Sequence, residues 1–244
     1  MIKINSFWLG NSLSQLEILS IKSHIKVGHC YNLWTYDNLD NVPLGANIKD
    51  AREILPAEKI FCYQIGEGKG SFSAFSNIFR YKLLEKKDGW WSDMDVIVLK
   101  KFDFFEDSVF ASEINRNGYS SPTTCVIKMD KSIAAKCYNE SCIYDQNKLK
   151  WGTIGPKLLT KEIFKLNNMS KYVQLPHVFC PINWFDSEKD PLVQKNIDIS
   201  KSHAVHMWHE MWRRSGIDKN GNYNQNCLFE KLKNDRMIDI YHPF

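Results

Sequence analysis

The sequence GWWSDMDVIVL, which runs from Gly89 to Leu99, decides the fold of this chain more than any other stretch. Its second part, Val96 to Leu99, is an unbroken apolar run rich in β-branched residues. Such a run is typical of a strand that is buried on both faces in the centre of a sheet. The stretch therefore predicts a central strand with two carboxylates, Asp93 and Asp95, at its edge.

Two strands with a helix between them are expected at the N-terminus. A capping box of Ser14 and Glu17 starts the helix, and Gly28 stops it. The flanking apolar runs, Ile4 to Leu9 and Tyr31 to Tyr36, read as strands. Strand, helix, strand is the opening of a parallel α/β sheet.

A second long helix, Phe72 to Lys86, follows a glycine-rich loop and leads directly into Gly89. One of its faces is aromatic and apolar, whereas the other carries three polar residues at helical spacing, namely Ser73, Asn77 and Arg80. Shorter elements are expected beyond Leu99: strands at Ser108 to Ala111 and Thr124 to Met129, and helices at Ser132 to Cys142 and near Pro156 to Leu166.

The composition is that of an ordinary globular protein of 244 residues, with a formal net charge of +4. No basic run is long enough to grip a phosphate backbone, which argues against a nucleic-acid partner. The sequence contains no apolar run of about 20 residues that could span a bilayer and no signal-peptide pattern at its start, so we expect a cytoplasmic protein. The seven cysteines are scattered without a Cys-x-x-Cys pair, and we interpret them as reduced, mostly buried small hydrophobes.

Asp93 and Asp95 are the strongest candidates for chemistry. In an extended chain, residues two apart project to the same side, so both carboxylates can converge on one hard cation. A solvated strand end would explain the pair equally well from spacing alone. Arg80 can pair with a phosphate or with Asp93, or it can be an ordinary surface arginine.

Five blocks of the chain together resemble the glycosyltransferases with a DXD sugar-binding region, a group similar to glycosyltransferase family 32. This group includes bacterial capsule and lipopolysaccharide transferases and, more distantly, glucosylating toxins. The blocks occur in the family's order and cover nearly the whole chain: Phe7 to Gly10, Phe75 to Tyr81, Gly89 to Val96, Trp151 to Pro156 and Ala204 to Arg213.

The resemblance implies a GT-A type nucleotide-binding fold. This is an α/β fold with a mixed central sheet flanked by helices, here as a single domain over residues 1–244. It also implies transfer of a hexose from a nucleotide diphosphate sugar, with retention at the anomeric carbon and with Mn²⁺ or Mg²⁺ as cofactor. The cation would neutralise the charge that develops on the departing diphosphate.

The resemblance also assigns roles to residues, which we carry over position by position. Asp93, Asp95 and His206 would bind the metal, and Asp93, Asp95 and Arg80 would be catalytic. Donor contacts would come from five residues: Trp8, which would stack near the base, and Ser73, Asn77, Arg80 and Trp212. Two departures stand out. Asn77 replaces an aspartate common in relatives, which affects the sugar that is bound, and Trp90-Trp91 replaces a Gly-Val pair.

For partners, the resemblance implies a UDP-hexose as donor and a glycan or lipid-linked oligosaccharide as acceptor, in surface polysaccharide biosynthesis. Loose peripheral contact with the inner face of the membrane would suit the basic charge balance.

Three other interpretations stay open from the sequence. His203, His206 and His209 are three apart and on a helix could suggest zinc, although the surrounding residues look strand-like. A nucleotidyltransferase also combines a Gly-Ser turn with an Asp-apolar-Asp strand, but here a whole helix fits between Ser71 and Asp93. A carbohydrate-binding protein without turnover would use the same fold and aromatic residues.

Overall fold

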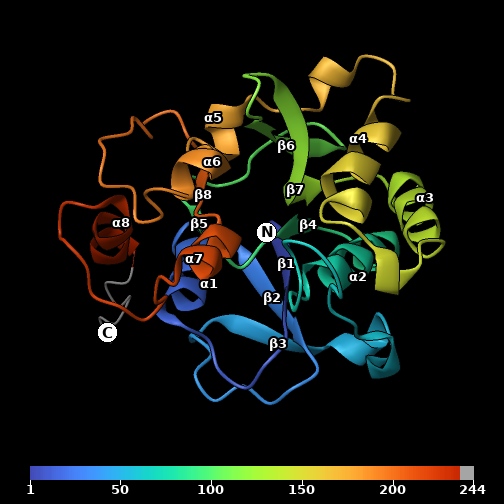
Figure 1. Ribbon diagram of the computed structural model, residues 1–244, viewed down its shortest axis with the longest axis horizontal. Coiled ribbons are helices and arrows are strands. Elements are labelled where there is room, and N and C mark those ends of the chain that lie inside the picture. The colour runs from blue at the N-terminus through green and yellow to red at the C-terminus, as the bar shows by residue number, and fades with distance from the viewer. Residues whose placement is uncertain (237–244) are drawn as a thin grey trace.

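A computed structural model describes residues 1–236 of the chain, and its centre is a mixed six-stranded sheet (Figure 1). The strand order is β3-β2-β1-β4-β7-β6. Strands β3, β2, β1 and β4 run parallel, while β7 is antiparallel to both β4 and β6. The strands of this sheet are β1 (Lys3–Trp8), β2 (Cys30–Thr35), β3 (Ala46–Asp50), β4 (Trp90–Ser92), β6 (Val109–Ile114) and β7 (Ser120–Lys128).

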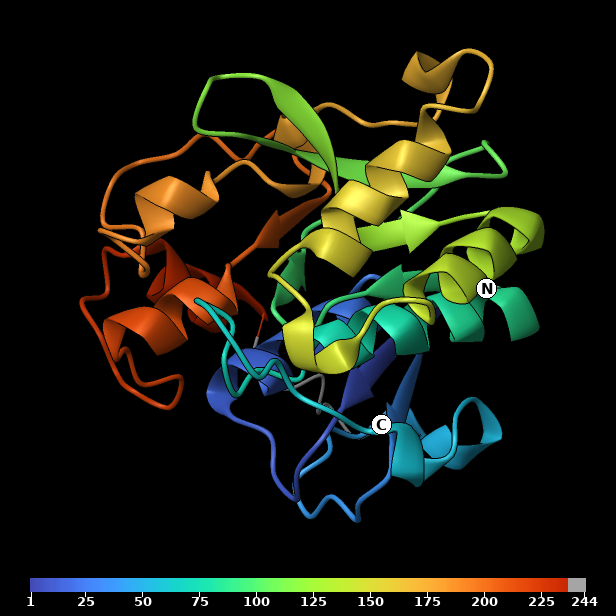
Figure 2. The ribbon, with the colours of Figure 1, turned by 45° about the vertical axis from the view of Figure 1, so that its right-hand side comes forward.

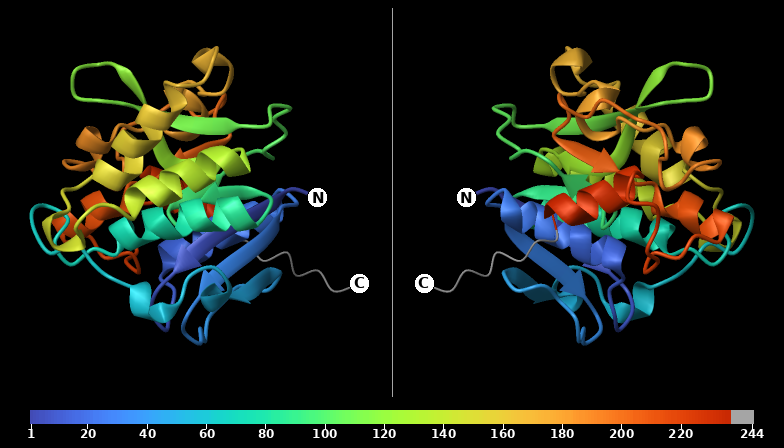
Figure 3. Two further views of the ribbon diagram at one scale, coloured as in Figure 1. Left: turned by 90° about the vertical axis from the view of Figure 1, so that its right-hand side faces the viewer. Right: turned by 90° about the vertical axis from the view of Figure 1, so that its left-hand side faces the viewer.

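Helices flank both faces of the sheet, which confirms the α/β class with a mixed central sheet. In chain order they are α1 (Gln15–Lys26), α2 (Ser73–Lys86), α3 (Lys131–Ser141), α4 (Leu158–Ile163), α5 (Pro176–Phe179), α6 (Trp184–Ser187), α7 (His209–Ser215) and α8 (Leu228–Arg236). Helices α2, α3 and α4 lie side by side over one face (Figure 2). Helix α1 covers the other face, and α7 and α8 lie on that side (Figure 3).

Alternation along the strands explains how both faces become buried. Neighbouring residues of a strand point to opposite sides of the sheet. Trp91 accordingly packs into the core under α2, whereas Trp90 packs into the core on the side of α1. Phe7 and Ile4 of β1 divide between the same two cores. Strands β1 and β4 are thus packed on both faces, which fixes the position of the chain where β4 ends.

The expected start of the chain is confirmed in detail. The capping box at the start of α1 forms, since Glu17 accepts a hydrogen bond from the backbone N–H of Ser14 and the Ser14 side chain accepts one in return from the third residue of the helix. Strands β1 and β2, which precede and follow this helix in the sequence, pair in parallel. The helix predicted from Phe72 to Lys86 forms as α2, and the predicted strands and helices beyond Leu99 correspond to β6, β7, α3 and α4.

One central expectation is wrong, because Val96 to Leu99 does not lie in the main sheet. Strand β5 (Val96–Val98) pairs antiparallel with β8 (Ala204–His206) in a separate two-stranded sheet, and β4 takes the central place instead. Serines of α1 satisfy the other edge of β5: Ser20 donates to Val96 O and Ser23 accepts from Val98 N. The apolar run is buried as predicted, but between a helix and one partner strand.

No helix within residues 1–236 is both long and apolar enough to cross a membrane.

Candidate functional site

The two aspartates lie in a tight turn between β4 and β5, not in extended chain as expected. The backbone N–H of Val96 donates to the carbonyl of Asp93 at 3.2 Å, and the N–H of Asp93 is bound by Cys125 O of β7 at 2.7 Å. Met94 points inward, where its sulfur accepts a hydrogen bond from the Tyr31 hydroxyl. The turn explains why the strand stops after Ser92, and it leaves both carboxylates partly exposed, Asp93 at 24% and Asp95 at 14%.

Pairing of β5 with β8 brings His206 to this turn. Val96 and His206 are register partners, and His206 Nε2 lies 3.3 Å from Asp95 Oδ2. Ligand atoms of Asp93, Asp95 and His206 all lie within 4.8 Å of one another. The three predicted metal residues are therefore brought together, although Asp93 and His206 are far apart in the sequence.

The neighbouring histidines have other environments. His203 Nε2 lies 3.8 Å from Asp103, and its ring packs near Phe104. His209 contributes its backbone N–H, which donates to Asp95 Oδ2 at 2.7 Å. Within residues 1–236, His203, His206 and His209 do not form a common group of metal-ligand atoms. The three histidines do not share a helix face, because His206 ends β8, His203 precedes that strand and His209 begins α7.

Arg80 lies on the opposite side of the turn from His206 and is buried against it. Its Nη2 pairs with Asp93 Oδ1 at 2.9 Å, its Nη1 donates to Thr124 O, and its guanidinium lies 4.7 Å from the Trp91 ring centre. The Trp91 indole also donates to Asp93 Oδ1, at 2.7 Å. Both hydrogen bonds go to Oδ1, so Oδ2 of Asp93 can still serve a ligand. Arg80 thus holds Asp93, which was one of the two partners expected for it.

The two carboxylates have opposite electrostatic settings. Burial raises the pKa of Asp93, and the repulsion by Asp95 adds to this, so that Arg80 only partly compensates. Burial acts in the same direction on Asp95, but His206 outweighs it and the net pKa of Asp95 is lowered. Burial lowers the pKa of His206, yet the Asp95 carboxylate raises it well above the usual value. Before any cation binds, the turn therefore holds an ion pair, Asp95 with His206, beside a carboxylate that is reluctant to ionise.

The predicted donor-binding residues differ in how accessible they are. Some are half-buried, and others lie in the core. Asn77 is 6% exposed, its Oδ1 has no hydrogen-bond partner, and it packs against Gly155. Ser73 lies one turn earlier on α2 and is half-buried. Trp8 is half-buried at the end of β1, with Lys219 Nζ 5.0 Å from its ring centre.

Trp212 is placed differently from what the resemblance implied. Its side chain is fully buried and packs edge-on against Phe229 of α8, with ring centres 4.9 Å apart. Helix α7 is amphipathic, and Trp212 lies on its inner face next to Met211. In this conformation the indole has no exposed surface on which a donor can stack, so we correct the expectation and assign Trp212 to the core.

Sequence reasoning missed Trp208, which shapes the His206 side of the site. It has left-handed backbone angles, φ 55° and ψ 50°, a conformation that is strained for a bulky residue. Its ring lies 3.9 Å from that of His206, and its indole donates to Ile182 O. This bend turns the chain from β8 into α7 and brings the N–H of His209 onto Asp95. No local sequence signal indicates such a backbone angle.

Comparison with known proteins gives partial matches to solved structures only. No protein-family model and no curated protein matches the sequence. The PaToxG glycosyltransferase is similar over 67% of this chain and 68% of its own, with 16% identity and a TM-score of 0.48. The galactosyltransferase LgtC, solved with donor and acceptor sugar analogues, is similar over 72% and 74%, with 13% identity and a TM-score of 0.42.

The glycosyltransferase GlyE of Streptococcus pneumoniae TIGR4 is similar over 72% of this chain, which spans only 45% of the GlyE chain, with 13% identity and a TM-score of 0.39. All three TM-scores are below 0.5 and no identity exceeds 16%. These matches therefore say nothing about substrate or mechanism in this chain.

Proposed function

We propose that this protein is a metal-dependent, retaining glycosyltransferase, similar to family 32, that moves a hexose from a nucleotide diphosphate sugar to a glycan acceptor. The observation that carries the proposal is the convergence of Asp93, Asp95 and His206 on one turn at the end of a parallel strand. In open α/β sheets, ligands bind at the carboxyl ends of the strands, where the strand order reverses. Strand β1 and its neighbours β2 and β4 meet this description.

The donor atoms of the site suit a divalent cation. Two carboxylate oxygens and one imidazole nitrogen form a mixed set that Mn²⁺ accepts, while Mg²⁺ prefers oxygen alone. Among residues 1–236, no hydrogen bond competes for Asp93 Oδ2, and a dication would offset the burial and the repulsion by Asp95 that raise the pKa of Asp93. When bound there, the cation supplies positive charge for the two phosphates of the donor and for the leaving diphosphate.

The remaining residues would position the donor. The Asn77 Oδ1 atom is buried and lacks a partner, so it can accept a hydrogen bond from a sugar hydroxyl, and Ser73 is on the same side of α2. Trp8 offers an aromatic face at the end of β1 for a nucleotide base. Arg80 keeps Asp93 in place and favours its ionised form, so it acts mainly through Asp93 and not directly on the phosphates.

A UDP-hexose is the donor we favour, and the acceptor is a glycan or lipid-linked oligosaccharide of a surface polysaccharide. Acceptor and location rest on the resemblance to capsule and lipopolysaccharide transferases. Loose attachment to anionic headgroups would contribute about 1 kcal/mol for each basic residue near the surface. Sedimentation with anionic vesicles at low and high salt tests this part, because such attachment must weaken with salt.

A donor-hydrolysis screen tests the function itself. The purified protein is incubated with a panel of nucleotide sugars and Mn²⁺, and release of the nucleoside diphosphate is measured. We expect release from at least one UDP-hexose, its loss in excess EDTA, and its return when Mn²⁺ is restored. Pyrophosphate release from a nucleoside triphosphate and a sugar phosphate would instead indicate a nucleotidyltransferase. Sugar binding without turnover of any donor would indicate a binding protein.

A further inference from the structure

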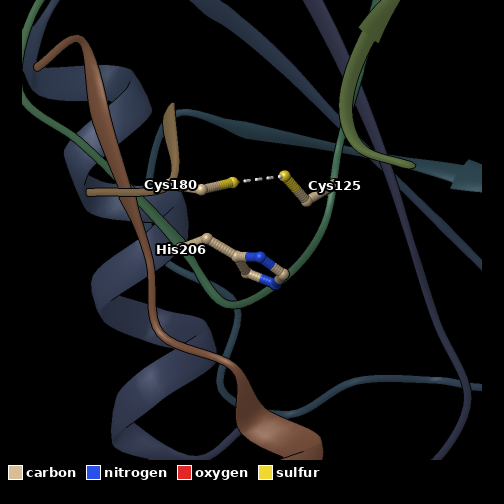
Figure 4. Close-up of side chains that lie close together, drawn as sticks. All are labelled: Cys125, Cys180 and His206. Carbon is tan, nitrogen blue, oxygen red and sulfur yellow. Dashed lines mark hydrogen bonds between the residues drawn. The ribbon is translucent and has the colours of Figure 1, made fainter. Parts of the chain in front are cut away.

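Two buried cysteines lie next to His206. Cys125 comes from β7 and Cys180 follows α5, and their sulfur atoms are 3.5 Å apart without forming a disulfide (Figure 4). Both residues are at most 2% exposed. Ligand atoms of Cys125, Cys180 and His206 all lie within 4.8 Å of one another. Three segments distant in the sequence thus bring two thiols and one imidazole to a single point.

The two nitrogens of His206 have unequal surroundings. Nε2 faces Asp95 Oδ2 at 3.3 Å, whereas Nδ1 is buried and has no hydrogen-bond partner in the part of the chain that the structure describes. The residue as a whole is only 7% exposed. A buried nitrogen without a partner costs free energy unless a ligand satisfies it. The imidazole ring lies beside the two sulfur atoms, as Figure 4 shows.

We propose that Cys125, Cys180 and Nδ1 of His206 form a binding site for a borderline-soft cation of the Zn²⁺ type, separate from the site of the proposed transferase metal. Zinc–sulfur bonds of about 2.3 Å in tetrahedral geometry place two sulfurs roughly 3.8 Å apart, close to the spacing in this structure. Two cysteines and one histidine leave a fourth position for solvent.

Asp95 supports the proposed zinc site through its contact with His206. A histidine that binds a metal through one nitrogen commonly donates its other N–H to a carboxylate, which fixes the orientation of the ring. His206 Nε2 and Asp95 have this relation. Cys180 also lies near three carboxylates, those of Glu113, Asp95 and Asp93. Their negative charge disfavours a thiolate without a metal, but it attracts a divalent cation. Each thiol releases its proton to solvent as its sulfur binds the cation, and the His206 imidazolium releases the proton of Nδ1 and keeps that of Nε2.

His206 belongs to both proposed metal sites, so the two cations should compete; this expectation rests on the proposed function. When Nδ1 binds zinc and Nε2 donates to Asp95, the imidazole is no longer a ligand for Mn²⁺ at Asp93 and Asp95. Zinc should therefore inhibit donor hydrolysis, and removal of the two thiols should relieve that inhibition without removing activity.

Cobalt titration tests the site independently of any activity. Reduced, metal-free protein is titrated with Co²⁺ without oxygen, and the near-ultraviolet charge-transfer band of thiolate-bound cobalt is recorded. We expect the band in the wild type, saturating at one equivalent, with release of about three protons per cobalt bound, two from the thiols and one from the His206 imidazolium. Cys125→Ala/Cys180→Ala should lose the band. Cys137→Ala/Cys227→Ala, which removes two equally buried thiols elsewhere, should keep it.

Asp93→Asn separates this proposal from the transferase proposal, because it should abolish donor hydrolysis while the cobalt band remains. Absence of a band in reduced wild-type protein would overturn the zinc site whether or not the variants fold. A band that survives in Cys125→Ala/Cys180→Ala would assign the thiolates to other cysteines, and the proposal would fail. A Cys125–Cys180 disulfide that forms in place of cobalt binding would also overturn it.

Discussion

The two sides of the Asp93–Asp95 turn are built in different ways. On one side, Asp93 is held by Arg80 and Trp91, which lie within 13 residues of it on the adjoining helix and strand. On the other side, Asp95 is held by His206 and by the backbone of His209, which is 114 residues away. The first side is assembled by neighbouring elements, while the second exists only after β5 and β8 have paired.

The difference also extends to charge. Asp93 faces a permanent cation, yet burial leaves its pKa raised, while Asp95 faces a titratable imidazole and has a lowered pKa. Arg80 has only 4% of its side chain exposed, so it is a fixed part of the core. His206 can release its contact with Asp95 to bind a cation. We infer that the Arg80 side provides rigidity and the His206 side provides the exchangeable ligand.

The largest effect is expected from Asp95→Asn, which breaks the His206 side at its charged centre. Donor hydrolysis should fall at least ~100-fold, the scale of removing one strong charge-stabilising element. The hydrogen bond from His209 N–H can persist to the amide oxygen, so far-ultraviolet circular dichroism should be unchanged. Asp103→Asn is the matched control, because Asp103 also faces a histidine, His203, outside the turn. Equal losses in both variants would rule out a special role for Asp95.

Arg80→Met should break the other side and act on stability. It leaves the Asp93 carboxylate without its cation, and breaking a fully buried pair costs about 3 to 5 kcal/mol. Because Asp93 is 24% exposed, we expect a loss of about 2 kcal/mol in the free energy of unfolding, measured by urea denaturation. Lys82→Met, on the same helix, breaks a more exposed pair with Glu85 and should cost less than about 1 kcal/mol. If both variants lost the same amount, Arg80 would not be the rigid element.

Elements held by local signals were predictable, and those fixed by distant contacts were not. The Ser14–Glu17 capping box and the helical spacing of α2 lie within single segments, so α1 and α2 were located from the sequence. The run Val96 to Leu99 indicated burial, but nothing in it specifies β8 as partner. For the same reason the sequence could not show the meeting of Cys125 with Cys180 or the burial of Trp212 against Phe229.

The proximity of three candidate metal ligands was predicted, but the geometry that brings them together was not. Asp93, Asp95 and His206 were named from a family resemblance, and they do converge. The reason given from spacing, two side chains on one side of an extended chain, was wrong, because a turn brings the carboxylates together. Arg80 and Asn77 were assigned to the donor from the resemblance, and the helical periodicity that places them on one face of α2 cannot reveal that both are buried.

His206→Ala should sharpen the contrast within the histidine triplet. Loss of a ligand should weaken the apparent Mn²⁺ affinity at least ~10-fold, since even outer-shell partners have effects of that size. His203→Ala should leave the affinity unchanged, because that ring packs near Phe104 and faces Asp103. His209→Ala should also be mild, since Asp95 uses only the backbone N–H of His209. Titration of donor hydrolysis with Mn²⁺ measures all three. Loss in His209→Ala with a normal His206→Ala would reverse our assignment.

The smallest effect concerns a buried histidine pair that supports the strand before the turn. His24 and His29 face each other through their Nδ1 atoms at 3.0 Å, and His24 Nε2 contacts the hydroxyl of Ser92, which precedes Asp93. His29 Nε2 accepts from the N–H of Phe102, so this nitrogen carries no proton. Only one proton fits between the two Nδ1 atoms, and both rings are therefore neutral in the folded state.

Acid should consequently weaken the fold before most carboxylates titrate. Burial, followed by the charge of His29, lowers the pKa of His24 well below its usual value. Burial, followed by the charge of Lys101, lowers that of His29 to about 4. Between pH 6.5 and about 4 the unfolded chain binds more protons than the folded one, so stability must fall as the pH falls.

We expect the pair to contribute a loss of about 1 kcal/mol in the free energy of unfolding between pH 7 and pH 6, from urea denaturation at a series of pH values. His29→Gln should make the slope less steep than in the wild type, because one ring of the pair no longer titrates, while His206, whose pKa is raised, acts in the opposite direction in both proteins. His177→Gln removes an exposed histidine and should leave the slope as it is. A stability that stays constant from pH 7 to pH 5.5 in the wild type would mean that the pair accepts a proton without leaving the fold. The strand before Asp93 would then be held by its pairing with β1 and β7 and by the hydrogen bond from Ser6 to Ser92 O, without a contribution from the histidine pair.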